Sequence, residues 1–145
     1  ALAQAGPDGS LSREMIQWLE IAAEDGKIVA QIELGKQLLL GSEADQAQAA
    51  VWFQRASTEE EGHPQAMFHL AMCYLRGKGV EKKPDVGIRW LKAAAKKGDP
   101  EAAFSLSCCF ASGEGVDKRA DKAWAWLLRA AEGGSASAMF NAHIR

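Results

Sequence analysis

Histidine and cysteine, which commonly bind zinc or take part in nucleophilic catalysis, are few in this sequence, with three of each. His69 and Cys73 lie four positions apart, a spacing that places both on one face of a helix, where they could contact one metal ion. A structural zinc site needs four such ligands, and no second histidine or cysteine pair has a matching spacing. The sequence therefore predicts no metal site and no cofactor, and both residues are expected to be structural.

Catalytic motifs are missing as well. A serine penicillin-recognising enzyme needs a lysine three residues after its serine, and none of the serines here has one. The segment Gly77-Lys78-Gly79 lacks the third glycine of a dinucleotide-binding fingerprint and follows no predicted strand. This segment is therefore interpreted as a turn that ends a helix, and the protein is predicted not to be an enzyme.

The elements that would position these residues recur at intervals of 36 residues. The recurring positions are Gly26, Gly62, Gly98 and Gly134, then Ala30, Ala66, Ala102 and Ala138, and then Leu34, Leu70 and Leu106. A repeat of this length predicts a stack of supersecondary units rather than one globular core. Such a stack offers an extended surface to partners more readily than a deep catalytic pocket.

Each repeat unit is predicted to contain two helices. In 64–76 the apolar residues Met67, Leu70 and Tyr74 recur at intervals of three and four, which indicates one buried helical stripe. Helix starts are marked by prolines, as in Asp99-Pro100, and helix ends by the repeated glycines. The expected helices are 12–25, 28–40, 44–57, 64–76, 85–97, 100–112, 119–132 and 136–144, preceded by a flexible segment at 1–10.

A tryptophan precedes each repeated glycine. These residues are Trp18, Trp52, Trp90 and Trp126. Their recurrence in register favours packing between successive helix layers over ligand stacking. We therefore expect all four to be structural.

The repeat resembles the Sel-1-like repeat family, a branch of the tetratricopeptide superfamily. One pass of the pattern is Trp90-Leu91, Ala94-Ala95, Gly98, Ala102 and Leu106, and the separating turn is Gly77-x-Gly79-Val80, repeated as Gly113-x-Gly115-Val116. The resemblance implies an all-α fold, a right-handed superhelical solenoid of helix pairs. It covers one domain, 11–145, with about three and a half repeats at roughly 12–41, 42–77, 78–113 and 114–145.

The resemblance also implies which residues line the inner groove, because the first helix of each unit faces it in such stacks. The positions carried over are Ile32, Lys36, Leu39, Phe68, Met72, Leu75, Phe104, Cys108, Ala111 and Phe140. The implied function is a non-catalytic scaffold or adaptor that binds a protein or peptide in this groove. Because Phe68, Phe104 and Phe140 recur in register, they fit either partner anchors or the packing of the repeat itself.

Family analogy leaves a second function open, a module that binds or hydrolyses cell-wall or β-lactam compounds, as in some cysteine-rich relatives. The chain has three cysteines, of which Cys73 and Cys109 are 36 residues apart. No pair has the spacing that joins the two helices of a unit in secreted relatives, so we expect free thiols, most of them buried. Free thiols favour the cytoplasm, whereas a removed signal peptide would place the protein in the periplasm or outside the cell.

Charge and hydropathy exclude two classes of partner. The net charge of −2 argues against nonspecific nucleic-acid binding, and no apolar stretch is long enough to cross a membrane. The sequence ends inside a predicted first helix that carries Met139, Phe140 and Ile144. This end fits either a segment of a longer protein or a capping helix, and its apolar surface is a candidate for a homodimer contact.

Overall fold

The computed structural model describes residues 13–58 and 62–134, which form seven α-helices and no strand. The helices are α1 (Arg13–Glu24), α2 (Ile28–Leu38), α3 (Glu43–Thr58), α4 (Pro64–Arg76), α5 (Pro84–Lys96), α6 (Pro100–Ser112) and α7 (Ala120–Glu132). The predicted helices within these residues are confirmed, with ends that differ by at most two residues. The predicted helix 136–144 and the N-terminal segment 1–10 lie outside the described residues.

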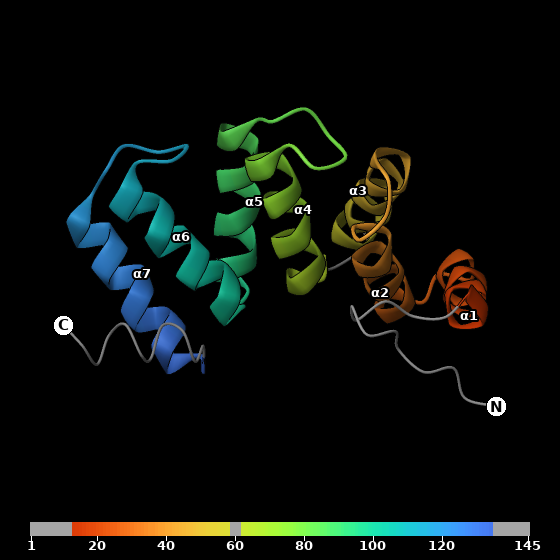
Figure 1. Ribbon diagram of the computed structural model, residues 1–145. Coiled ribbons are helices and arrows are strands. Elements are labelled where there is room, and N and C mark those ends of the chain that lie inside the picture. The colour runs from red at the N-terminus through yellow and green to blue at the C-terminus, as the bar shows by residue number, and fades with distance from the viewer. Residues whose placement is uncertain (1–12, 59–61, 135–145) are drawn as a thin grey trace.

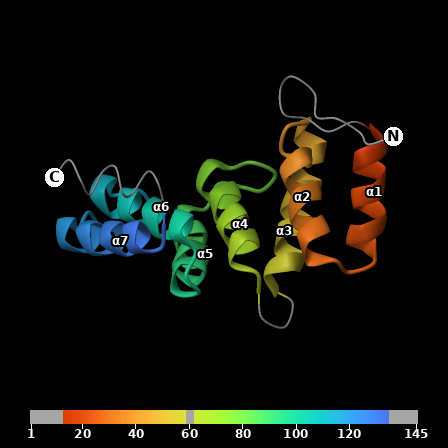
Figure 2. The same cartoon turned by 90° about the horizontal axis from the view of Figure 1, so that it is seen from below.

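The helices form an arch in which each helix runs antiparallel to the next (Figure 1). The most extensive contacts join α2 to α3, α4 to α5 and α6 to α7, so these are the helix pairs, and α1 packs on α2. Seen from below, α2, α4 and α6 lie along one side of the row, and α3, α5 and α7 lie along the other (Figure 2). The predicted all-α repeat solenoid is therefore confirmed.

Local sequence explains where the helices begin and end. Pro64, Pro84 and Pro100 each occupy the first helical turn, where no backbone N–H is needed for an intrahelical bond. Two of the first helices, α4 and α6, end at Gly77 and Gly113, which adopt φ values of 69° and 82°. This left-handed conformation favours glycine because it has no Cβ, and it closes the helix by a hydrogen bond from the glycine N–H.

The core runs along the whole stack instead of filling one centre. Three clusters of buried side chains follow one another, the first between α1 and α2, the second among α2, α3 and α4, and the third among α4, α5, α6 and α7. The first cluster contains Leu34, the second contains Leu70 and the third contains Leu106. All three of these recurring leucines are almost fully buried. Many other core residues are alanines, which allow helices to approach closely.

The tryptophans divide into two groups. Trp52, Trp90 and Trp126 are half-buried against the core clusters, and Trp90 touches both the second and the third cluster. The interpretation of Trp18 as a packed residue was wrong, because its side chain is 68% exposed. The physical reason lies in the stack, since this position packs on the preceding helix pair, as Trp90 does, and no described pair precedes α1.

The turns after α4 and α6 pack against the preceding helix pair. A Cβ on Gly79 would collide with the backbone carbonyl of Gln46 on α3, and a Cβ on Gly115 would lie 3.1 Å from the carbonyl oxygen of Pro84 on α5. Each turn therefore rests on the second helix of the preceding pair, and Figure 1 shows both turns reaching towards it. Glycine is required here for close approach as well as for its positive φ.

Candidate partner-binding face

The predicted groove positions that the structure describes lie on the first helices of the three pairs or, for Leu39, directly after one. Seven of them are at the surface: Lys36, Leu39, Phe68, Met72 and Phe104 are partly buried, and Cys108 and Ala111 are exposed. We call these seven residues the inner face. They come from α2 with its C-cap residue Leu39, from α4 and from α6, and these helices share one side of the row in Figure 2.

Two of the predicted positions belong to the core instead. Ile32 is 2% exposed and packs in the second cluster, and Leu75 is 4% exposed and packs in the third. The side chain of Leu75 fills the space over Gly87 on α5, where an added Cβ would lie 2.8 Å from its Cγ. Both residues are therefore removed from the surface that a partner could contact. Phe140 lies outside the described residues.

A small hollow opens on the inner face between the ends of α2 and α4. Its volume is about 240 Å³, and it is lined by Leu39, His69, Met72, Cys73, Arg76 and Lys78. We call it the α2–α4 hollow. Its walls are mostly apolar, and its two cationic residues are exposed. Lys36 lies close by, and its Nζ is 3.2 Å from Oε1 of Glu33.

His69 is held rigidly in the wall of this hollow. Its imidazole stacks on the ring of Phe53 with centroids 5.1 Å apart, and it meets the ring of Phe68 edge-on at 5.3 Å. Burial, followed by the positive charge of Lys36, lowers the pKa of His69 to about 4. The imidazole is therefore neutral at physiological pH and contributes packing rather than charge.

The cysteines are all free thiols, as predicted. Cys73 and Cys109 are buried, and burial raises the pKa of each thiol to about 11, so both are unreactive small apolar groups. Cys108 is exposed on the inner face. Among residues 13–58 and 62–134, no three histidine, cysteine or acidic side chains come together in a way that could hold a metal ion.

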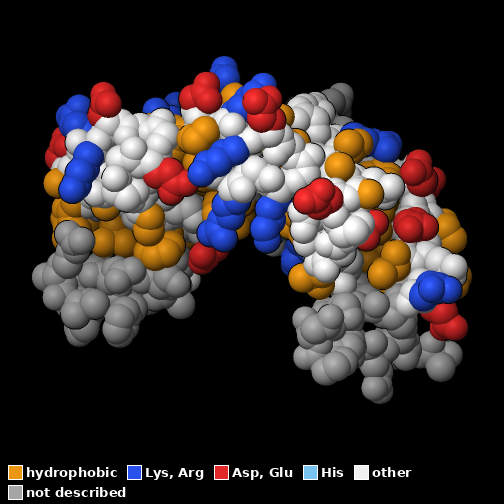
Figure 3. Space-filling model, turned by 45° about the horizontal axis from the view of Figure 1, so that its top comes forward, with side chains coloured by type: hydrophobic (Ala, Val, Ile, Leu, Met, Phe, Trp, Pro, Cys, Tyr) orange, Lys and Arg blue, Asp and Glu red, His pale blue; other side chains and the backbone are white. Residues whose placement is uncertain are grey.

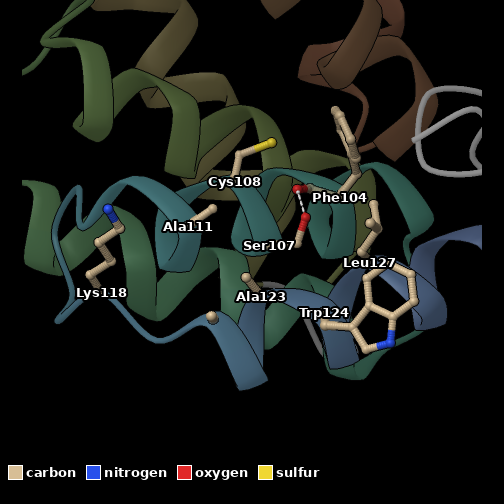
Figure 4. A pocket seen from close by; sticks show the side chains of 9 residues that line it. Phe104, Ser107, Cys108, Ala111, Lys118, Ala123, Trp124 and Leu127 are labelled. Atoms are coloured by element: carbon tan, nitrogen blue, oxygen red, sulfur yellow. Dashed lines mark hydrogen bonds between the residues drawn. The ribbon is translucent and has the colours of Figure 1, made fainter. Parts of the chain in front are cut away.

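A second, larger pocket opens between α6 and α7 (Figure 4). Its volume is about 400 Å³. The inner-face residues Phe104, Cys108 and Ala111 contribute to its lining from α6, and Trp124 and Leu127 contribute from α7. Trp124 is 37% exposed at this pocket. We call it the α6–α7 pocket.

The α6–α7 pocket has a counterpart one repeat earlier that is filled by the protein itself. The positions 36 residues before Ala111, Trp124 and Leu127 are Leu75, Ile88 and Leu91, and these are buried in the cluster to which α6 contributes. In that earlier repeat the equivalent side chains pack in a cluster with the first helix of the next pair, α6. The α2–α4 hollow lies in the middle of the described stack and is not filled in this way.

Sequence reasoning missed three polar members of the α2–α4 hollow. His69, Arg76 and Lys78 were not among the predicted groove residues, because the family pattern marks inward positions by their offset from the recurring leucine alone. A signal was present in the sequence. The residues 36 positions further on are Ser105, Ser112 and Glu114, so the three do not recur, and repeat packing does not require them.

Comparison with known families agrees with the geometry. The model of the Sel1 repeat matches the chain at residues 16–27, 28–60, 64–99 and 100–135. The chain belongs to the Sel1 repeat family. The three longer matches begin at the start of α2, α4 and α6, so each Sel1 repeat here is a first helix with the second helix that follows it. Sel1 repeats are commonly scaffolds for protein interactions.

Two solved Sel1-type structures are similar to this chain. A Sel1 repeat protein from Oxalobacter formigenes has a TM-score of 0.78 and 30% sequence identity, over 86% of this chain and 49% of that one. A protective antigen present in uropathogenic Escherichia coli strains has a TM-score of 0.76 and 30% identity, over 92% of this chain and 32% of that one. This chain therefore spans about half and about a third of the length of these relatives.

A more distant structure supports the fold alone. Cysteine rich protein B of Helicobacter pylori has a TM-score of 0.62 and 20% identity, over 88% of this chain and 91% of that one. A search among curated proteins found no match to this sequence. Within the described residues, no helix is both long and apolar enough to cross a membrane.

Proposed function

We propose that this Sel1 repeat stack is a non-catalytic scaffold that binds a polypeptide partner along the inner face. The observation that carries the proposal is the overlap between that face and the two openings. Leu39 and Met72 line the α2–α4 hollow, and Phe104, Cys108 and Ala111 line the α6–α7 pocket. Apolar side chains that stay at the surface and line hollows are the usual anchors of protein interfaces.

The rigidity of the stack supports this role. Leu34, Leu70 and Leu106 are buried beneath the inner face, one in each first helix, so the face is held by the core of every repeat. A surface that is already ordered loses little conformational freedom on binding, which favours association. The adaptable side chain of Met72 at the centre of the face suits a peptide with apolar residues.

Site-specific photocrosslinking tests the proposal without disturbing the core. A benzoylphenylalanine is introduced in place of Met72 or of Cys108, and the protein is irradiated in an extract of the source cells. We expect both positions to give crosslinked polypeptides that mass spectrometry identifies as the same partner. Val51 on α3 is the matched control, because it is an exposed apolar residue on a second helix.

The pattern of crosslinks decides the outcome. Crosslinks from positions 72 and 108 that are missing from position 51 support the inner face as the binding surface. Equal crosslinking from all three positions, or crosslinking from position 51 alone, contradicts it. Circular dichroism of each substituted protein verifies that the helices are retained.

A further inference from the structure

The charged residues of the α2–α4 hollow are not explained by the repeat. Positions that pack the stack recur every 36 residues, as Leu34, Leu70 and Leu106 do. Arg76 and Lys78 do not recur, and one repeat later their places are taken by Ser112 and Glu114. The stack therefore folds with uncharged or acidic residues at these positions. Repeat packing therefore does not account for Arg76 and Lys78.

The local charge at the hollow is positive although the protein is acidic. The positive charges are those of Lys36, Arg76 and Lys78, and Glu33 beside Lys36 offsets one of them. The C-terminal ends of α2 and α4 contribute about −0.5 of an elementary charge each. Even with the negative charge of these helix ends, the net charge at the hollow is positive. Within the described chain, neither Arg76 nor Lys78 makes an ion pair, so both remain available to a ligand.

Cationic side chains gather near the middle of the stack. Figure 3 shows lysine and arginine side chains gathered at the hollow of the arch, between its two limbs. A negatively charged partner approaching from this side would be attracted to the middle of the stack rather than to its ends. Long-range attraction of this kind raises the rate of association and selects partners of opposite charge.

The size and lining of the hollow favour a side chain over a cofactor. Its volume of about 240 Å³ is smaller than that of a typical small-molecule site, which is roughly 300–1,000 Å³. Leu39 and Met72 offer apolar contacts, and the neutral ring of His69, fixed between Phe53 and Phe68, forms a firm wall. One apolar side chain with an adjacent carboxylate matches these contacts.

From these observations we infer that the α2–α4 hollow binds an acidic segment of a polypeptide partner. An apolar side chain of the segment contacts Leu39 and Met72, and a neighbouring aspartate or glutamate pairs with Arg76 and Lys78. The inference rests on the proposed function, because it assumes that the inner face binds a polypeptide. It adds the chemical class of the partner and the position of its charged residue.

Fluorescence anisotropy with defined probes tests this inference. The probes are short labelled peptides in which glutamate and leucine alternate, the same peptides with glutamine in place of glutamate, and a single-stranded oligonucleotide. We expect the glutamate peptides to bind at least about tenfold more tightly than the glutamine peptides, a difference that shrinks as salt is raised.

Two double variants with equal changes in charge locate the binding site. The first is Arg76→Glu with Lys78→Glu at the hollow, and the second is Arg89→Glu with Lys96→Glu at exposed positions on α5. We expect the first to lose at least about tenfold in affinity for the glutamate peptides. The second should lose much less, because its charges lie on the other helix of the pair.

The inference fails if the glutamate and glutamine peptides bind equally, if both double variants lose the same affinity, or if the oligonucleotide binds more tightly than every peptide. It also fails if no glutamate peptide binds. Failure of the inference is distinguishable from failure of the proposed function, because the crosslinking from positions 72 and 108 does not depend on charge. If crosslinks form but acidic peptides are not preferred, the proposed scaffold function stands and the inference of an acidic partner is rejected.

Discussion

Gly35 on α2 lies directly against the ring of Phe53 on α3. A Cβ built on Gly35 would be 2.6 Å from Cε1 of that ring, closer than side-chain atoms can approach. Phe53 is fully buried, so the ring has no room to move away. The two residues are therefore matched in size, the smallest possible side chain facing a large one.

The other repeats use a different match at the same place. Phe53 follows Trp52, and the residues that follow Trp90 and Trp126 are Leu91 and Leu127. The positions equivalent to Gly35 in those repeats are Ala71 and Ser107. A larger residue on the first helix thus accompanies a smaller one on the second, and total volume is conserved.

Gly35→Ala should destabilise the protein by about 1–3 kcal/mol, the usual cost of overpacking a core. Adding Phe53→Leu should recover part of this loss, because it recreates the alanine and leucine pair of the next repeat. Urea unfolding of both single variants and the double variant gives the coupling energy. Strictly additive effects would contradict the size match.

Gly79→Ala should cost more than Gly98→Ala, although both glycines have a positive φ, of 75° and 101°. At Gly98 no atom lies within 4 Å of an added Cβ, so only the backbone conformation is penalised, by about 1–2 kcal/mol. At Gly79 the Cβ would also collide with the carbonyl of Gln46. Equal losses of unfolding free energy would mean that the turn does not press on α3.

The double variant Phe68→Ala with Phe104→Ala should weaken partner binding while lowering the melting temperature only modestly. Both rings are partly exposed, so each truncation removes less buried area than at a core position. Phe53→Ala is the contrasting variant, because that ring is fully buried and its loss should cost about 3–5 kcal/mol. An unfolded double variant by circular dichroism would assign the two rings to the core.

Acid should weaken the fold through His69. Its folded pKa of about 4 lies below the ordinary value of 6.5, so the unfolded chain binds the proton more readily. The stability that His69 contributes is present above pH 6.5 and is lost as the pH falls towards 4, by at most about 1.4 kcal/mol per pH unit. Lys36 adds to the lowering of this pKa and Glu33 opposes it.

His69→Phe isolates this effect, because the variant keeps an aromatic ring between Phe53 and Phe68 and cannot be protonated. The difference in unfolding free energy between wild type and variant should be constant above pH 6.5 and should shift in favour of the variant below it. All other titrating groups are common to both proteins and cancel. A difference that does not change between pH 6.5 and 4 would show that His69 is protonated without penalty.

The sequence determined the architecture because repeat packing is a local and periodic requirement. The recurring leucines and alanines, such as Leu70 and Ala66, are buried, and the recurring glycines end helices, as the pattern predicts. Each such residue meets the same neighbours in every repeat, so its spacing alone reveals its environment. For this reason the sequence placed the seven described helices to within two residues at each end.

Only the tertiary structure decided which side chains reach the surface and what they meet there. Leu75 shares the helix face of Met72 but is buried over Gly87, and Trp18 is exposed because no described helix pair covers it. Arg76 and Lys78 line the same hollow as Leu39, although they are more than 35 residues apart in the sequence. Such contacts depend on how successive helices cross. Residues that do not recur have no periodic pattern in the sequence from which their surroundings could be predicted.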